Sequence, residues 1–323
     1  MLSDFGRLFV AVACALLPLT ADAARVQRPL RPRTPSHRPS NTESPAAMQD
    51  RTSPHPQDAE PSDFDRARWV REVRSTRYLP PDDAWLDAFG TLVGNADRTS
   101  DRSSGRKTDR DALARWQTLG FETRRRGDVL WVRETAPPSG KGAYALRTGG
   151  TRALLLQAPH GDTDMGTRDI ALSLFDETGA LALAINSARR DAAPEADQAH
   201  SPRGPFARMA TTLAAAHPGL LTVQVHGFSA RTAEALEVSP DTVIVGGGSA
   251  IDNADFAACL RTHGFAAMAT NERTRRLAGQ TNAVRSALRR DGSPRFVHLE
   301  FGPDERNRLL REPAARKALA RCL

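Results

Sequence analysis

The stretch ALLLQAPHGDTD, residues 153–164, joins a short apolar run to a loop that carries His160, Asp162 and Asp164. An apolar run of this length, bounded by Pro and Gly, is typical of a strand buried on both faces of a parallel sheet. Residues that directly follow such a strand lie at its carboxyl end, where open α/β sheets bind their ligands. The stretch therefore predicts a fold class and, at the same place, a functional site.

Similar apolar runs recur along the chain and alternate with segments of helical spacing. The expected strands cover residues 153–158, 180–185, 221–225, 242–245, 266–269 and 296–300, and the expected helices cover residues 167–177, 205–217, 253–263 and 303–321. Strands that alternate with helices in this way favour an α/β fold with a largely parallel sheet and helices on both faces. We expect this domain to occupy residues 142–323.

The region before this domain, residues 63–141, has a mixed pattern. Helical spacing occurs at residues 64–73, 82–93 and 109–119, and a strand-like run follows at 128–133. A second strand-like run, at 143–147, lies just past the boundary with the α/β domain. The pattern predicts a small α+β region, which is either a separate subdomain or an N-terminal elaboration of the α/β domain.

The start of the chain resembles a targeting segment followed by a linker. Residues 1–23 combine Arg7, an apolar run and the triplet ADA, which together are typical of a secretory signal peptide. Residues 24–62 contain eight Pro and no aromatic residue, so they cannot bury enough apolar surface to fold. We therefore expect a disordered Pro/Arg-rich linker in an exported protein, either periplasmic or secreted.

The charge and the apolar runs of the chain indicate whether it binds nucleic acid or crosses a membrane. The chain has 45 Lys and Arg against 38 Asp and Glu, a formal net charge of +7. A nucleic-acid partner is not expected, because this charge is spread through the linker and the N-terminal region without interleaved aromatic residues for base stacking. No apolar run approaches the about 20 residues that a transmembrane helix needs, so no transmembrane segment is expected either. Nothing in the sequence specifies an oligomeric state.

Two cysteines, Cys259 and Cys322, follow the predicted signal peptide. In an oxidising compartment they can form a disulfide, and on two predicted helices they can equally be buried as small apolar residues. The sequence favours neither alternative.

Side chains suited to metal chemistry follow the expected strands. His160 and Asp164 come after the first strand, and His226 directly follows the run at 221–225. Because the carboxyl ends of parallel strands meet at one edge of a sheet, we expect these three residues to bind zinc and to leave a fourth position open for water. Glu300, which ends the last strand, is the candidate general base.

Further polar residues are expected around this centre. Asn186, Arg190 and His200 follow the second strand, and His298 lies on the same strand face as Glu300. We expect these residues to contact the substrate, with Arg190 as the anchor for a substrate carboxylate.

Five stretches carry a resemblance to a known family. They are APHGDTDMGTRDIALSLFDE (158–177), VQVHGF (223–228), TVIVGGG (242–248), HGFAAMAT (263–270) and HLEFGPDER (298–306). Over about residues 142–311, the chain resembles the poly-gamma-glutamate hydrolase family, which is related to the zinc carboxypeptidases. The resemblance implies a zinc carboxypeptidase-like fold, zinc ligands at His160, Asp164 and His226, and catalytic roles for Glu300 and Arg306.

The loop after the first strand departs from the family pattern. The family loop carries a glutamate before Pro-Gly-Thr, whereas the loop here is one residue shorter and has Asp164 before the triplet MGT. Asp162 is therefore a rival metal ligand, or a carboxylate that orients a ligand histidine or contacts the substrate.

These observations predict an exported, zinc-dependent amide hydrolase, either a peptidase or an amidase. The resemblance does not carry the family's substrate over to this chain, because residues 186–206 depart from the family pattern. The arginines near the expected site indicate an anionic substrate: a γ-glutamyl, peptide or peptidoglycan-stem amide with a nearby carboxylate, as in an acidic peptide, polyglutamate or a peptidoglycan-like polymer. The shortened loop and its aspartate motivate an alternative, a non-catalytic binding module that retains the fold without the metal.

Overall fold

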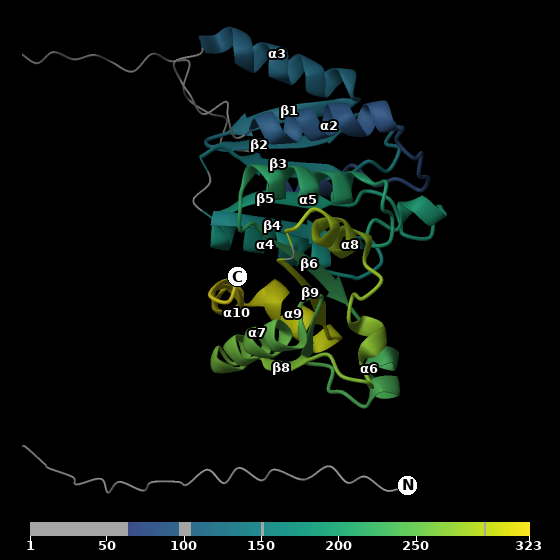
Figure 1. Cartoon of the computed structure of the whole chain (residues 1–323), viewed down its shortest axis with the longest axis vertical. Helices are drawn as coiled ribbons and strands as arrows, with labels where there is room; N and C mark the ends of the chain where they lie inside the picture. Colours follow the sequence, from purple (N-terminus) through teal and green to yellow (C-terminus); the bar gives the residue numbers. More distant parts are fainter. Residues whose placement is uncertain (1–63, 97–104, 150–151, 294) are drawn as a thin grey trace, which may run out of the picture. The chain divides into compact units, whose positions relative to one another are not determined.

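A mixed sheet of nine strands runs through the described residues (Figure 1). The strands are β1 (Phe121–Arg126), β2 (Val129–Glu134), β3 (Ala143–Arg147), β4 (Arg152–Ala158), β5 (Ala180–Ile185), β6 (Leu221–Gly227), β7 (Thr242–Gly246), β8 (Ala266–Ala269) and β9 (Phe296–Phe301). Their order in the sheet is β1-β2-β3-β5-β4-β6-β9-β7-β8. This computed structural model describes residues 64–96, 105–149, 152–293 and 295–323, so the predicted signal peptide at 1–23 and linker at 24–62 lie outside the described residues.

The centre of the sheet is parallel. Strands β5, β4, β6 and β9 run in the same direction, and β3 and β7 join the two sides of this group antiparallel. The α/β fold class is confirmed, and each expected strand is present. The β1–β2–β3 edge is antiparallel because its connections are too short for the crossover that parallel neighbours require.

Helices cover both faces of the sheet (Figure 1). One layer contains α2 (Asp83–Ala96), α3 (Gly105–Thr118), α5 (Pro205–Ala216) and α8 (Ala283–Arg290). The other contains α1 (Arg66–Arg71), α4 (Thr167–Thr178), α7 (Ala250–Thr262), α9 (Pro303–Arg311) and α10 (Pro313–Ala320), and α6 (Ala230–Leu236) packs beside β7. Strand β4 contributes side chains to the core on both faces of the sheet. Leu154 and Leu156 point toward the layer that contains α4, and Leu155 points toward the opposite layer.

The helices differ from the expected ones in two respects. The single helix expected at 303–321 is divided into α9 and α10, because Glu312 is extended, with φ −109° and ψ 104°. Glu312 precedes Pro313, and the proline ring disfavours a helical conformation in the residue before it. The short helices α6 and α8 were not expected, since seven and eight residues give too few turns for a clear helical period.

The predicted α+β region contributes, within its described residues, to the same sheet. Strand β2 pairs with β3, β3 pairs with β5, and α2 packs against α5. The region therefore extends one edge of the α/β domain.

The two cysteines form a disulfide. Cys259 on α7 and Cys322 after α10 are joined with a Cα–Cα distance of 5.9 Å. Of the two alternatives that the sequence leaves open, the structure contains the bonded pair, which links the end of the chain to α7.

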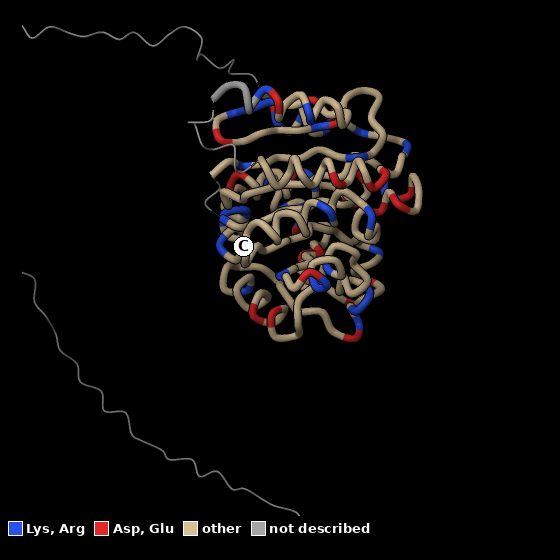
Figure 2. Tube along the Cα trace, turned by 45° about the horizontal axis from the view of Figure 1, so that its top comes forward, with Lys and Arg blue, Asp and Glu red and all other residues tan. Residues whose placement is uncertain are grey.

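None of the helices in the described part of the chain is long and apolar enough to cross a bilayer. Figure 2 shows Lys and Arg interspersed with Asp and Glu along the described trace. Because the two signs are mixed, local groups of charges matter more for binding than the net charge does.

Candidate metal centre

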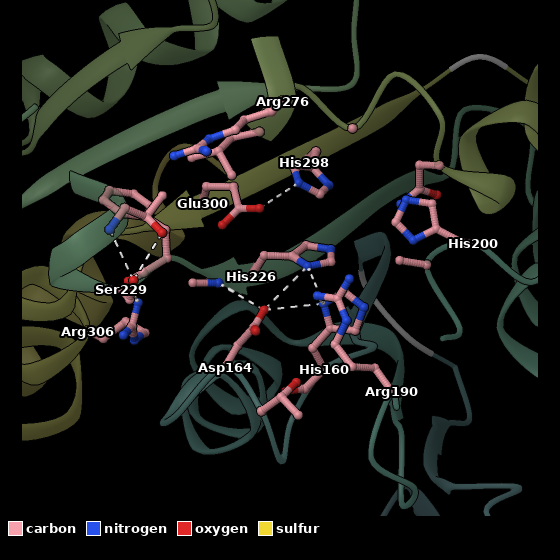
Figure 3. Close-up of a pocket in the computed structure, with 18 of the residues that line it drawn as sticks. His160, Asp164, Arg190, His200, His226, Ser229, Arg276, His298, Glu300 and Arg306 are labelled. Atoms are coloured by element: carbon pink, nitrogen blue, oxygen red, sulfur yellow. Dashed lines mark hydrogen bonds and ion pairs between the residues drawn. The ribbon is translucent and has the colours of Figure 1, made fainter. Parts of the chain in front are cut away.

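A cavity of about 1030 Å³ opens at the carboxyl ends of β4, β6 and β9 (Figure 3). His160 lies just after β4, His226 lies in β6 and Glu300 lies in β9. Strands β6 and β9 pair with His226 opposite Glu300, which places both residues at one level of the sheet. The structure thus brings these strand-end side chains to one cavity.

A tight turn after β4 carries Asp164 back toward His160. The backbone N–H groups of Thr163 and Asp164 donate to the carbonyl oxygen of His160 at 2.9 and 2.8 Å. The Asp164 carbonyl oxygen accepts hydrogen bonds from the N–H and Oγ1 of Thr167, at 3.1 and 2.7 Å, where α4 begins. The turn therefore directs the Asp164 side chain without help from a metal ion.

Three ligand atoms of His160, Asp164 and His226 converge in the cavity (Figure 3). The Nδ1 atoms of the two histidines are 3.1 Å apart, and Asp164 Oδ2 lies 3.3 Å from His160 Nδ1 and 3.6 Å from His226 Nδ1. In a tetrahedral zinc site with bonds of about 2.0–2.1 Å, neighbouring ligand atoms are about 3.3–3.4 Å apart. The three residues therefore have separations close to those that one zinc ion requires.

The hydrogen bonds beneath His226 determine which of its nitrogens carries the proton. The carbonyl oxygen of Phe206 accepts from Gln157 Nε2 at 3.0 Å, so Gln157 Oε1 faces Gln224 and accepts from Gln224 Nε2 at 2.8 Å. Gln224 Oε1 then faces His226 Nε2 at 3.0 Å and also accepts from Asn282. His226 Nε2 must carry the proton, so Nδ1 of the neutral ring presents a lone pair to the cavity.

His160 has the same tautomer for a different reason. Its Nε2 donates to Asp197 Oδ1 at 2.8 Å, and such carboxylate–histidine pairs support metal-binding imidazoles. Its Nδ1 accepts from Arg190 Nη1 at 3.2 Å. Two imidazole lone pairs and one carboxylate oxygen thus face one another, an arrangement that a cation between them stabilises. Two nitrogens and one oxygen are a donor set that fits zinc.

The charges around the centre also favour a cation. Burial raises the pKa of Asp164, but its interactions with the His160 and His226 side chains outweigh burial and hold that pKa below its usual value. Burial also raises the pKa of Asp197, and its histidine partners again outweigh burial and lower it. Burial lowers the pKa of His160, but its two carboxylate partners outweigh burial and raise it. Burial, aided by the neighbouring His298, holds the pKa of His226 well below its usual value, so this ring is neutral, as a metal ligand must be.

Glu300 and His298 form the wall of the cavity on the β9 side. His298 Nε2 lies 3.1 Å from Glu300 Oε1, and the ring centroids of His298 and His226 are 4.1 Å apart. His298 Nδ1 is buried and has no hydrogen-bond partner among the described residues, so we assign the proton to Nε2, which donates to Glu300. The second carboxylate oxygen of Glu300 makes no hydrogen bond within the described chain and remains available to the cavity.

Arg306 is buried at the same edge of the cavity. Its Nη1 donates to the carbonyl oxygen of Phe228 at 2.9 Å and to that of Phe301. A Cβ atom at position 227 would collide with this guanidinium group, so Gly227 is required for the close approach. Burial lowers the pKa of Arg306. The side chain therefore ties the ends of β6 and β9 together beside the centre.

Asp197 connects the centre to the loop after β5. Its Oδ2 lies 3.0 Å from Arg190 Nη2 and 3.1 Å from His200 Nδ1, while Oδ1 binds His160. Arg190 and His200, which the sequence analysis expects to contact the substrate, line the cavity, but Asp197 balances the charge of Arg190. The sequence reasoning assigned no role to Asp197. Its only signal there is a carboxylate three residues before His200.

Two other predicted residues lie outside the cavity lining. Asp162 forms an ion pair with Arg168 and lies 3.2 Å from Arg74 Nε, so Asp164 is the carboxylate that faces the two histidines. The buried amide of Asn186 donates to two backbone carbonyl oxygens at 2.9 and 3.0 Å. Both side chains thus support the loops around the centre.

No family model matches the chain, and no curated protein matches it. Among solved structures, the chain is similar to zinc-free YndL, with a TM-score of 0.39 and 17% identity over 56% of this chain and 87% of that one. It is similar to a bacteriophage poly-gamma-glutamate hydrolase, with a TM-score of 0.33 and 18% identity over 52% of this chain and 82% of that one. It is also similar to an aspartoacylase family protein from Mesorhizobium loti, with a TM-score of 0.31 and 17% identity over 62% of this chain and 66% of that one. These likenesses are distant.

Proposed function

We propose that the protein is a zinc-dependent hydrolase of amide bonds, with His160, Asp164 and His226 as the metal ligands. The observation that carries the proposal is the convergence of two imidazole lone pairs and one carboxylate oxygen, all within 4.8 Å of one another, at the ends of parallel strands. Three protein ligands with an open fourth position are the arrangement of catalytic zinc, whereas structural zinc has four protein ligands.

The residues around the ligands have separate tasks in this reaction. Bound zinc supplies a Lewis acid and lowers the pKa of water. Glu300 takes a proton from the attacking water and returns it to the leaving amine, while His298 holds one of its carboxylate oxygens in place. Arg306 provides a fixed positive charge at the edge of the cavity, near the place where negative charge develops on the substrate carbonyl oxygen.

The substrate that we propose is an amide in an anionic molecule: a γ-glutamyl, peptide or peptidoglycan-stem amide with a nearby carboxylate. Support comes from the described cavity lining, which contains four arginines and two acidic residues. We also propose that the protein is exported to the periplasm or secreted. The disulfide between Cys259 and Cys322 supports export, because disulfides persist in oxidising compartments.

The first test is the zinc content of the chain from residue 24 onward, measured by elemental analysis. One zinc per chain in the wild type, lost in His160→Ala and in His226→Ala, is the expected result. Cleavage of γ-linked glutamate oligomers, peptides and peptidoglycan stem fragments is then followed through the new amino groups that it releases. Glu300→Gln should keep the zinc and lose the cleavage. A wild-type protein that takes up no zinc on titration would contradict the hydrolase and leave a binding module.

A further inference from the structure

Two of the four arginines that line the cavity are already engaged. Arg190 pairs with Asp197 at 3.0 Å and donates to His160 at 3.2 Å. Arg306 is 7% exposed and donates to two backbone carbonyl oxygens. Arg190, which the sequence predicts as the carboxylate anchor, therefore already has an internal carboxylate as its partner.

Arg275 and Arg276 are the unpaired cations of the lining. Both residues are exposed, and within the described residues neither side chain has an ion pair or a hydrogen bond. Figure 3 shows Arg276 on the Glu300 side of the cavity, whereas Arg190 lies on the His160 side. Two exposed guanidinium groups that lack a counter-charge within the described residues offer their donors to an anion in the cavity.

The backbone that carries these two arginines is held at both ends. They lie in the short 3-10 helix η4 (Arg275–Leu277). Thr274, the residue before η4, is fully buried. Its N–H donates to Asn271 Oδ1 at 3.0 Å, and the N–H of Asn271 donates back to Thr274 Oγ1 at 2.9 Å. After η4, the carbonyl oxygen of Ala278 accepts a backbone hydrogen bond at 2.9 Å from the residue that follows β7. The turn thus presents both side chains without the entropy cost of ordering a mobile loop.

Resting on the proposed hydrolase function, we propose that Arg275 and Arg276 bind a second carboxylate of the substrate, on the Glu300 side of the scissile amide. Each guanidinium offers a planar fork of donors that matches a carboxylate. The substrate is then a chain that carries a carboxylate beyond the residue at which it is cleaved. A short amide with a single carboxylate leaves this subsite empty, so the two arginines select acidic oligomers.

The test is a binding experiment that does not depend on turnover. A γ-linked glutamate hexamer is titrated calorimetrically into zinc-loaded Glu300→Gln protein, with and without the double change Arg275→Gln and Arg276→Gln. The matched control is the double change Arg289→Gln and Arg290→Gln, an adjacent exposed pair on α8 that lies outside the cavity lining. A hexamer whose side-chain carboxylates are amidated serves as the ligand control.

We expect the change at 275 and 276 to raise the Kd for the hexamer by about 10-fold to 150-fold, the loss of one charged hydrogen bond or more. The control change at 289 and 290 should alter the Kd for the hexamer by less than about 2-fold, because surface charges far from a ligand contribute little. The amidated hexamer should bind the parent protein and both double variants with the same Kd. Three results would overturn the subsite: an equal loss of hexamer affinity in both double variants, no loss of affinity in either, or no binding of the hexamer to the parent Glu300→Gln protein.

Cleavage of the same hexamer by protein with Glu300 intact separates this proposal from the proposed function. Binding that depends on Arg275 and Arg276, without any cleavage, would contradict the hydrolase and leave the subsite in place. Cleavage with Kd and KM unchanged by the double substitution would overturn the subsite and leave the hydrolase.

Discussion

The Nδ1 atoms of His160 and His226 lie 3.1 Å apart, although the other ring nitrogen of each histidine already donates to an acceptor. Two neutral imidazoles in these tautomers cannot hydrogen-bond each other, because both nitrogens present lone pairs. Asp164 adds a carboxylate oxygen at 3.3 Å from one of them. The protein therefore holds three electron-rich atoms together through contacts beneath them, which is the preorganisation that a metal site needs.

Zinc should stabilise the fold through these ligands. At free zinc about 1,000 times above its Kd, the free energy of unfolding should rise by about 4 kcal/mol, and chelation should reverse the rise. His160→Ala should abolish this zinc-dependent shift in Tm. His217→Ala, on a histidine at the end of α5 that lies outside the cavity lining, is the control and should retain the shift. An equal shift in wild type and His160→Ala would place the zinc elsewhere.

Asp197 should tune zinc affinity without touching the metal. Because it accepts the proton of His160 Nε2, Asp197→Asn should weaken zinc binding by about 10-fold to 100-fold, measured by competition with a chelator of known affinity. Asp191→Asn changes the same charge in the same loop, on an exposed carboxylate that pairs with Arg189, and should leave the affinity unchanged. Equal affinities in all three proteins would show that the contact with Asp197 has no such role.

Glu300→Gln should separate binding from chemistry. With the proton acceptor gone, kcat should fall by about 10²-fold to 10⁴-fold. The zinc content should stay the same, because Glu300 is not one of the proposed ligands His160, Asp164 and His226. His226, His298 and Glu300 form a second group that could hold a metal ion, so loss of zinc from Glu300→Gln would assign the ion to that group. Retention of wild-type kcat would assign the general base to another residue.

Gly227→Ala should destabilise the protein through Arg306. The added methyl group would displace the guanidinium from the carbonyl oxygens of Phe228 and Phe301, at a cost of about 1–3 kcal/mol in the free energy of unfolding. Urea unfolding of Gly227→Ala, Arg306→Ala and the double variant checks the mechanism. The double variant should lose less than the sum of the single losses, and strict additivity would contradict the proposed collision.

The two tyrosines predict an alkaline limit to stability. Both are buried; burial raises the pKa of Tyr78 to about 12 and that of Tyr144 well above its usual value. An unfolded tyrosine ionises near about pH 10, so Tyr78 contributes stability below that pH and loses it as the pH rises toward about 12. The loss from Tyr78 is about 2–3 kcal/mol, and Tyr78→Phe should flatten this part of the stability curve. Phenolate absorbance should appear together with unfolding in an alkaline titration, and phenolate formed in the folded protein near pH 10 would contradict the assignment.

Much of the fold followed from local patterns. The run ALLLQA at 153–158 lies in β4 and is buried from Leu154 onward, and the runs at 180–185 and 221–225 lie in β5 and β6. Short apolar segments have few other ways to be buried. The same reasoning placed His160, His226 and Glu300 at one edge of the sheet, since parallel strands end together. The break at Glu312 was missed, although Pro313 signalled it, because helical spacing on both sides hid the boundary.

The sequence left open which of several neighbouring loop residues face the centre, and the tertiary structure decided this. Asp162 and Asp164 are two residues apart, and only the turn at His160 and the ion pair with Arg168 direct them to different partners. The sequence indicated Arg190 as the free cation. The folded chain pairs it with Asp197 and leaves Arg275 and Arg276, some 80 residues later in the chain, at the cavity without a partner in the described residues.

The sequence by itself therefore determined the strands, the longer helices apart from the break at Glu312, and the edge of the sheet at which the reactive side chains lie, because hydrophobic period and strand ends are properties of short segments. Only the tertiary structure decided which charges cancel and which remain available. Ion pairing depends on distances between loops that are remote in sequence, and those distances exist only after the sheet has brought the loops together.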